Sequence, residues 1–374
     1  MDVKVYPVKT KNDLRKFIHL PAKIHKNHSN WVPPIYMDDW QFFNPKKNRT
    51  FSYCDTILLL ASQNGEVVGR VMGIISHKYN KAKNENNARF CFLETYDNFD
   101  VAKALLENIE NWAKSKGAIK LVGPLGFSDK DPQGLLIEGF NEPNVIASNC
   151  NFPYLTNLVE KAGFAKEIDL VVYKVMIPDQ IPDFYARILQ RAQKNNKDLR
   201  IIDFKSRKHI KPYVTPVLSL MNETYKEIYG FALMDETEMN EFATRYLPIL
   251  NPNFIKVVVN DDNKVIAFIL TMPDISDGII KSKGHIFPFG IFQIFKSQKR
   301  TKQLNLLLGA IQEHHRNKGI DTIMGAKILE EAQKAGLKYI DSHLILENNF
   351  KMRAEVERMG GVVYKRYRIF QKSL

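Results

Sequence analysis

The fold class is clearest in LNLLLGAIQEHHRNKGIDTIMGAKILEEA, residues 304–332. The pattern predicts an apolar strand, a short polar loop that contains Arg316, Lys318 and Gly319, and then a long helix. A helix N-terminus presents unpaired backbone amides and the positive end of its dipole, so such a loop can bind a diphosphate. Glycine allows a close backbone approach, and the two cations add positive charge. The sequence therefore predicts a phosphate-binding loop between a strand and a helix.

The order helix, glycine, strand occurs twice in the chain. Residues 102–116 have an amphipathic pattern that stops at Gly117, and residues 319–335 have one that stops at Gly336, each before an apolar strand. VEKAGF at 159–164 and VERMGG at 356–361 also match, with an offset of 197 residues. Two matched pairs in the same order indicate the duplication of one unit.

Each half also contains the pattern of a β-hairpin. The apolar runs at 56–76 and 254–274 are interrupted by the turn signals Asn64-Gly65 and Asp262-Asn263. We therefore predict an α/β (α+β) fold with two tandem domains, each with a mixed, mostly antiparallel sheet flanked by helices. The predicted domains are 1–176 and 201–374, and residues 177–200 are the predicted linker, because polar residues and prolines interrupt the pattern there.

The composition limits the choice of partner and compartment. The 374 residues include 54 Lys and Arg against 41 Asp and Glu, for a formal charge of +13, which favours anionic partners. No helix-turn-helix or RNP signature is present, so we expect no nucleic acid partner. The three cysteines are widely spaced and the N-terminus has no signal-peptide pattern, so we expect a cytoplasmic protein. His25 and His28 have no third ligand nearby in sequence, so we expect no metal site.

The loop RNKGID at 316–321 resembles the diphosphate loop of the GNAT superfamily of acyl-CoA N-acyltransferases, which reads Q/R-x-x-G-x-G/A. Arg316 and Gly319 match, and Asp321 replaces the usual small residue. The C-terminal run LENNFKMRAEVERMGGVVYKRYRIFQK resembles the last strands and the fourth helix of that superfamily. The resemblance covers 200–374 well and 1–176 more loosely, so the chain resembles a tandem GNAT protein of bacterial type.

This resemblance implies that the C-terminal domain binds acetyl-CoA or a longer acyl-CoA and transfers the acyl group to a primary amine. We expect backbone amides near Ala310 and Ile311 to hold the thioester oxygen, with a strand bulge at Gly309. Asn349 would lie beside the acyl-pantetheine chain. The full set of expected acyl-CoA contacts is Ala310, Ile311, Arg316, Asn317, Lys318, Gly319, Ile320, Asp321, Asn349 and Met352.

The general acid and base stay open at this point. The helix position that carries a tyrosine acid in many GNAT enzymes is Val356 here. Substitutes by position are Tyr364 and Tyr367 in the closing strand region, and Tyr225 or Tyr229 in NETYKEIYGF; the candidate bases are Glu347 and Glu223. For each of them, packing or solvation alone is the simpler explanation of the residue.

The N-terminal domain is expected to lack a cofactor. Aligning Gly117 with Gly336 places Asp97 opposite Arg316 and Asp100 opposite Gly319, and two carboxylates would repel a diphosphate. This half also contains some 22 extra residues, because Gly117 and Gly163 are 46 positions apart whereas Gly336 and Gly360 are 24 apart. The insertion either covers the cleft of the other domain or is a surface elaboration.

The acceptor is suggested by the segment 278–303, in which four Phe residues lie among lysines and one arginine without any acidic residue. Such a segment favours peripheral contact with an anionic membrane through 284–300, although an interdomain packing element would show the same pattern. Some bacterial ceramide synthases are GNAT-type proteins, so the resemblance also implies a lipid-like (sphingoid) amine as acceptor. The alternative is a non-catalytic protein that binds acyl-CoA, a membrane or a protein partner on the same scaffold.

Overall fold

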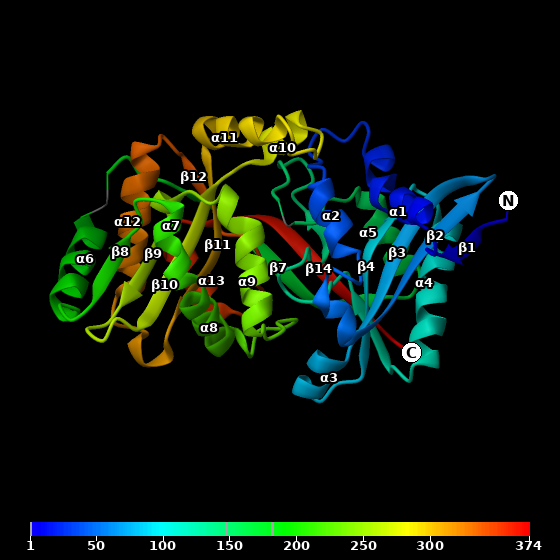
Figure 1. Cartoon of the computed structure of the whole chain (residues 1–374), viewed down its shortest axis with the longest axis horizontal. Helices are drawn as coiled ribbons and strands as arrows, with labels where there is room; N and C mark the ends of the chain where they lie inside the picture. Colours follow the sequence, from blue (N-terminus) through cyan, green and yellow to red (C-terminus); the bar gives the residue numbers. More distant parts are fainter. Residues whose placement is uncertain (1, 147, 181–182) are drawn as a thin grey trace.

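The computed structural model describes residues 2–146, 148–180 and 183–374. Within this part of the chain, fourteen strands form one sheet, and helices cover it on both sides (Figure 1). All strand pairs are antiparallel except β4–β5 and β11–β12, which are parallel. The predicted α/β class with a mixed, mostly antiparallel sheet is therefore confirmed. No helix in the described part is both long and apolar enough to cross a bilayer.

The N-terminal half begins the sheet at its outer edge. Its strands are β1 (Lys4–Pro7), β2 (Cys54–Gln63), β3 (Glu66–Ser76), β4 (Asn87–Thr95), β5 (Lys120–Gly123), β6 (Leu135–Glu138) and β7 (Ala165–Met176). Its helices are α1 (Lys11–Ile24), α2 (Tyr36–Phe42), α3 (His77–Lys83), α4 (Phe99–Ser115) and α5 (Pro153–Lys161).

The C-terminal half repeats this order from the opposite edge. Its strands are β8 (Arg200–Asp203), β9 (Ile255–Val259), β10 (Val265–Pro273), β11 (Gln303–Ile311), β12 (Tyr339–Asp341), β13 (Ile345–Leu346) and β14 (Val362–Ser373). Its α-helices are α6 (Asp183–Asn195), α7 (Arg207–Ile210), α8 (Val214–Tyr225), α9 (Glu236–Tyr246), α10 (Ser276–Lys281), α11 (Gly290–Arg300), α12 (Ile320–Lys334) and α13 (Phe350–Arg358).

Local sequence signals explain the boundaries of several elements. Asn64 and Gly65 adopt φ of 53° and 81°, the left-handed pair that a two-residue hairpin turn requires, so the β2–β3 hairpin forms as predicted. In the second hairpin Asn263 has φ of 60°, but the connection spans 260–264 and is longer than the predicted turn. Gly117 and Gly336 follow α4 and α12 in the left-handed conformation, which ends both helices.

The last strand of each half is exchanged with the other half. Strand β7 pairs with β12 of the C-terminal half, and β14 pairs with β5 of the N-terminal half. The two exchanged strands pair with each other along nearly their whole length at the centre of the sheet. Figure 1 shows the red strand β14 crossing from the middle of the molecule to the N-terminal half. The boundary at 176 therefore divides the sequence repeat, while the sheet is continuous across it.

The hydrophobic core reflects this exchange. Phe370 of β14 is fully buried in a cluster otherwise built by the N-terminal half, with residues such as Phe90 and Leu105. The repeat itself is confirmed by strand register. Aligning Gly117 with Gly336 makes Val122 equivalent to Asp341, and the offset of 197 residues makes Gln371 equivalent to Lys174. Asp341 pairs with Lys174, and Val122 likewise pairs with Gln371. The duplicated units thus keep equivalent hydrogen-bonding partners.

Two predicted segments differ in detail. The predicted linker 177–200 contains the helix α6, which contacts α12, and its residues 181 and 182 lie outside the described residues. The run 337–346, expected as one strand, is split into β12 and β13 by residues 342–344. His343 in this break has φ of 55°, which lies outside the β region.

Candidate functional site

The parallel strands β11 and β12 separate after their first three residues. They pair only at 303–305 and 339–341, and beyond this point β13 pairs with β7 instead. We call the divergence between residues 306–311 and residues 342–346 the split. The bulge expected at Gly309 is wrong: Leu308 lies opposite Leu270 and Leu306 opposite Thr271, so the extra residue is Leu307. The bulge lies at the start of the split.

Backbone groups of β11 face the split at alternate residues. Both the amide and the carbonyl of Gly309 bond to the Tyr225 hydroxyl, at 3.2 and 2.8 Å, and the Ile311 carbonyl accepts a bond from Arg316 at 3.2 Å. Because antiparallel pairing alternates, the amide of Ala310 points toward β10. Of the two expected oxyanion donors, Ile311 therefore faces the split and Ala310 does not. Burial raises the pKa of Tyr225 to about 12, so the phenol is protonated at neutral pH.

The loop after β11 has the form expected for phosphate binding. A single 3-10 turn, η5 (Glu313–His315), leads to α12, whose first residue is Ile320. Gly319 is the N-cap with φ of 79°, and no side chain caps the helix. Arg316, Asn317 and Lys318 are exposed beside these amides. The loop can therefore offer uncapped amides and two cations to an anion.

Gly319 has a packing role that the sequence did not indicate. A Cβ at this position would lie 2.6 Å from the Cβ of Ala192 in α6. The Asn196 amide holds this contact by donating to the carbonyls of Lys318 and Ala192, at 2.9 and 2.7 Å. Glycine is thus needed both for its left-handed conformation and for the close approach of α6 to α12.

The other expected cofactor residues have mixed positions. Ile320 is buried in the core and Asp321 is exposed in the first turn of α12. Asn349 is the N-cap of α13 and accepts from the Met352 amide at 3.3 Å, so its position is explained by capping. Met352 packs against the core cluster around Val356. These contacts account for Asn349 and Met352 without a ligand.

The predicted catalytic residues do not converge on one point. Glu347 is held by the ammonium of Lys166 at 2.8 Å and by the amide of Asp169 at 3.0 Å. Tyr367 is fully buried with its hydroxyl 3.5 Å from Asn144, and Glu223 is exposed on α8. Tyr229, the remaining candidate of its segment, donates to Glu167 at 3.2 Å. The fixed partners of Glu347 and Tyr367 favour structural roles.

Tyr364 belongs to a buried charged cluster at the split that sequence reasoning missed. Its hydroxyl donates to Asp341, whose other oxygen accepts from the His343 amide at 2.7 Å. The ammonium of Lys365 lies 3.9 Å from Asp341 and donates to the Pro143 carbonyl at 2.6 Å. Burial is the main cause that raises the pKa of Tyr364 and lowers that of Lys365. The cluster joins β12, β14 and the insertion of the N-terminal half.

His343 joins this cluster through its backbone amide, and its imidazole is the titratable group there whose ordinary pKa lies nearest to 7. Burial lowers the pKa of its imidazole below 6.5, while Asp341 opposes this and Lys365 reinforces it. The imidazole is therefore neutral at pH 7 and can accept a proton. A signal was present in the repeat: the positions equivalent to Asp341 and His343 are Val122 and Pro124 in the other copy. Polar residues in only one of two copies mark that copy as different in function.

The N-terminal half fills the equivalent split with its own chain. The amide of Leu125 donates to the carbonyl of Phe90 at 2.9 Å, so the insertion continues along β4 where β12 leaves β11 in the other half. Arg89 fixes it by donating to the carbonyls of Gly126 and Phe127. Helix α4 is capped by Asn98, which accepts from the Val101 amide at 3.3 Å. In this copy the insertion is therefore bonded to the edge of β4 at Phe90, and one of the first amides of α4 is bonded to the Asn98 side chain.

His25 and His28, for which the sequence predicted no metal site, belong to a hydrogen-bonded chain. His25 lies 3.2 Å from Glu94 through Nε2 and 3.0 Å from His28 through Nδ1. Their rings stack with Trp31 and Phe152. In the described ranges, no group of three or more His, Cys, Asp or Glu residues is arranged to hold a metal ion.

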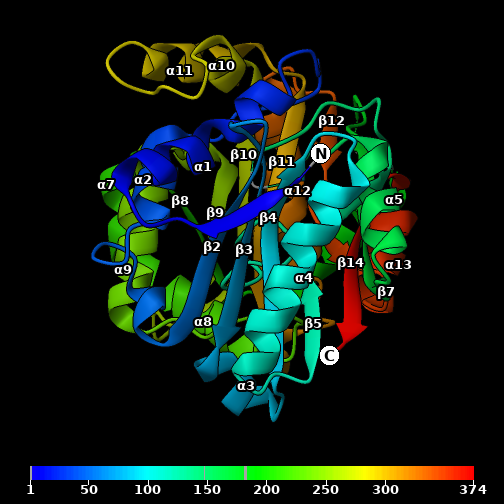
Figure 2. The ribbon, with the colours of Figure 1, turned by 90° about the vertical axis from the view of Figure 1, so that its right-hand side faces the viewer.

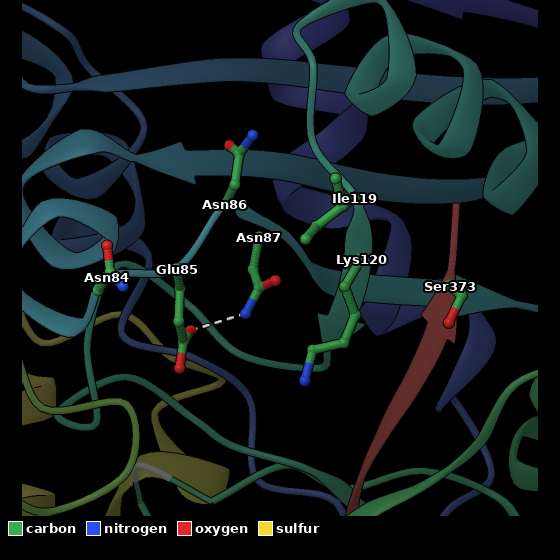
Figure 3. Close-up of a pocket in the computed structure, with 7 residues that line it drawn as sticks. All are labelled: Asn84, Glu85, Asn86, Asn87, Ile119, Lys120 and Ser373. Atoms are coloured by element: carbon green, nitrogen blue, oxygen red, sulfur yellow. Dashed lines mark hydrogen bonds between the residues drawn. The ribbon is translucent and has the colours of Figure 1, made fainter.

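One surface hollow of about 560 Å³ lies beside the first residues of β4 and β5 (Figure 3). Its lining includes Glu85, Asn87 and Lys120, and the labelled carboxylate of Glu85 accepts from the Asn87 amide at 2.6 Å. Residues 87 and 120 are the first paired positions of β4 and β5, before those strands diverge. The hollow therefore lies apart from the split in either half.

Comparison with known proteins gives the same fold. A tandem GNAT protein from the clavulanic acid biosynthesis pathway superposes with a TM-score of 0.58 at 11% identity, covering 100% of this chain and 98% of that one. The bacterial ceramide synthase of Caulobacter vibrioides is 26% identical over 380 residues, covering 100% of this chain and 98% of that protein. Protein YghO of Escherichia coli is 26% identical over 377 residues, covering 97% and 94%. No protein-family model matches the sequence.

Proposed function

We propose that this chain, which has the tandem GNAT fold, is a CoA-dependent N-acyltransferase with one active site, at the split of the C-terminal half. The observation that carries the proposal is the difference between the two copies. In the C-terminal copy the strands diverge and α12 begins without a cap, beside Arg316 and Lys318. In the N-terminal copy the insertion bonds to the edge of β4 at Phe90 and Asn98 caps the helix.

The acyl-CoA would be held at two places. Arg316, Lys318 and the first amides of α12 would bind the diphosphate, because a helix N-terminus and two cations favour a polyanion. The edge of β11 beyond Asn305 would bind the extended amide chain, since it lacks a parallel neighbour, and the Tyr225 hydroxyl would have to leave the Gly309 backbone groups to which it is bonded. When bound, the thioester supplies an activated carbonyl carbon with a thiolate leaving group. The Ile311 amide is the nearest expected donor for the carbonyl oxygen.

The residues at the split supply both proton transfers that the reaction needs. The neutral amine attacks the thioester carbonyl carbon, so a C–N bond forms and the C–S bond breaks. His343 would accept the proton that the amine nitrogen loses, and Tyr225 would give a proton to the departing thiolate. Asp341 acts through its bond to the His343 amide and is a positioning residue. Lys365 ties this group to the insertion through Pro143.

For the acceptor we propose a lipid-like primary amine of the sphingoid type. The relative from Caulobacter vibrioides is named as a bacterial ceramide synthase and matches along the whole chain. The insertion also brings apolar side chains to the split, since Leu136 and Phe140 cluster with Leu344 and Leu346. A lipid-like acceptor would be met at a membrane surface. Turnover with sphingoid amines against short polar amines, at equal acyl-CoA, measures this preference directly.

Replacing Arg316 with alanine is expected to weaken acyl-CoA binding by about tenfold or more, because a charge-assisted hydrogen bond contributes about 1.5–3 kcal/mol. Isothermal titration with acyl-CoA measures the change. Lys334→Ala, at the far end of the same helix, is the matched control and should bind normally. Equal affinity of the Arg316 variant and the control would contradict the diphosphate site.

Replacing Tyr225 with phenylalanine separates proton donation from simple occupation of the strand edge. As the general acid, the hydroxyl should contribute about 10²–10⁴-fold to kcat, so the variant should lose activity on that scale. The measurement is kcat with saturating acyl-CoA and amine, and Tyr229→Phe is the control. An unchanged kcat with tighter acyl-CoA binding would show that the hydroxyl only fills the edge of β11.

A binding protein without catalysis is the second candidate, and Val356 favours it. This residue occupies the helix position expected for a tyrosine acid and is 1% exposed in the core. Acyl-CoA binding that depends on Arg316, without turnover over a broad panel of amines, would support this function instead of acyl transfer.

A further inference from the structure

The helices α10 and α11 form a hairpin at one edge of the molecule, at the top of Figure 1, with an unusual apolar tip. Phe287, Phe289 and Phe292 are 67%, 76% and 67% exposed. These three side chains lie within six residues, while most other large exposed apolar residues are scattered over the chain. A cluster of exposed aromatic side chains marks an interaction surface, because folding alone would bury them.

Loose packing of the hairpin does not explain why the tip is exposed. Ile286 is 8% exposed and Ile294 is fully buried, and both belong to the core of the C-terminal half. The connection also touches the N-terminal half, where the Tyr36 amide donates to the Gly284 carbonyl at 3.1 Å. Figure 2 shows the hairpin at the top of the molecule, on the side of α1 and α2. The three phenylalanines therefore project from a well-anchored element.

The charged residues from 278 to 303 are all positive. Residues 278–303 contain no Asp or Glu, and Lys283, Lys296, Lys299 and Arg300 are exposed. Lys281 is paired with Asp277 at 2.6 Å, just outside this run. Among the ion pairs of the described residues, none involves the other four cations. Exposed aromatic side chains on the same hairpin as exposed cations, which lie on the connection and on the second half of α11, are complementary to an anionic surface with an apolar interior.

The base of the hairpin is connected to the split by hydrogen bonds. Asp274, just before α10, accepts from Asn305 at 3.1 Å, and Asn305 accepts from Gln303 at 2.7 Å. Asn305 is the last residue of β11 that pairs with β12, opposite Asp341. The base of the hairpin is thus bonded to β11 next to the start of the split.

We propose that the α10–α11 hairpin docks this protein on the surface of an anionic lipid bilayer, with the three phenylalanines inserted among the acyl chains and the four cations at the headgroups. The inference rests on the proposed function in one respect only: docking would serve to present a lipid-like amine to the split. Docking itself needs no substrate. It is therefore measured separately from acyl transfer.

The test is co-sedimentation of the full chain with vesicles of phosphatidylcholine alone and of phosphatidylcholine with phosphatidylglycerol in equal parts. We expect binding to the anionic vesicles that is at least about tenfold stronger than to the neutral ones and that falls with salt. The variant Phe287→Ser/Phe289→Ser/Phe292→Ser should lose most of the bound fraction. A variant with Lys283, Lys296, Lys299 and Arg300 replaced by Gln should lose the preference for anionic vesicles.

Phe350→Ser is the matched control, because Phe350 is 72% exposed on α13, away from the hairpin. All variants replace exposed side chains, and circular dichroism establishes that each is folded. Equal binding of the triple phenylalanine variant and the control would overturn the proposal. Self-association that the triple variant abolishes, without vesicle binding by the native chain, would assign the surface to a second copy. Turnover of a soluble amine without vesicles tests acyl transfer alone.

Discussion

Replacing Phe370 with alanine is expected to lower the free energy of unfolding by about 3–5 kcal/mol, the usual cost of removing a buried phenylalanine from a core. Phe370 is fully buried and is the fifth residue from the C-terminus, yet its neighbours belong to the N-terminal half. Chemical denaturation measures the loss. Hydrogen exchange should show that protection falls first in β4, β5 and α4.

The matched control for this prediction is Phe350→Ala, at an exposed position of the same half, which should change stability by less than about 0.5 kcal/mol. Loss of protection in α12 and α13, with α4 unchanged, would show that β14 stabilises its own half rather than the other. That result would contradict the strand exchange.

Replacing His343 with asparagine is expected to lower kcat by about 10²–10⁴-fold, the usual contribution of a general base. Asparagine tolerates the left-handed backbone at this position, where φ is 55°, so the variant should keep the fold. The native enzyme should also show a characteristic pH dependence. Because burial lowers the pKa of the imidazole below 6.5, kcat should fall as the pH drops through that lowered pKa.

His314→Asn is the control, since His314 is exposed in the loop before α12 and has no proposed part in proton transfer. The variant should keep the acid limb of the native profile. The same acid limb in His343→Asn, with only a small loss of kcat, would assign the base to another group. Glu223, which is exposed on α8, is the remaining candidate of the predicted pair.

Local signals were enough to predict the elements and their repetition. Asn64-Gly65, Gly117 and Gly336 each require a left-handed backbone, so the turns and helix ends they mark follow from the residues themselves. The loop between β11 and α12 could be predicted for the same reason, because its glycine and two cations are adjacent in sequence. These features depend on neighbouring residues only.

The exchange of β7 and β14 could not be predicted in this way. Both strands have the same length and a similar apolar pattern, so pairing within a half and pairing across the halves are equally compatible with the sequence. The prediction of the candidate site was incomplete for a related reason. Tyr225 meets Gly309 across 84 residues, and Asp341 meets Lys365 on a different strand. His343 was hidden in a run that reads as a continuous strand.

The strand exchange has a consequence for the ancestry of the molecule. Two separate copies of the repeated unit, each lending its last strand to the other, would form a symmetric homodimer with β7 and β14 side by side on the twofold axis. Joining the two copies in one polypeptide keeps this interface and allows the two copies to differ in sequence. One copy could then fill its split with an insertion and become a structural support, while the other kept its open strand edge.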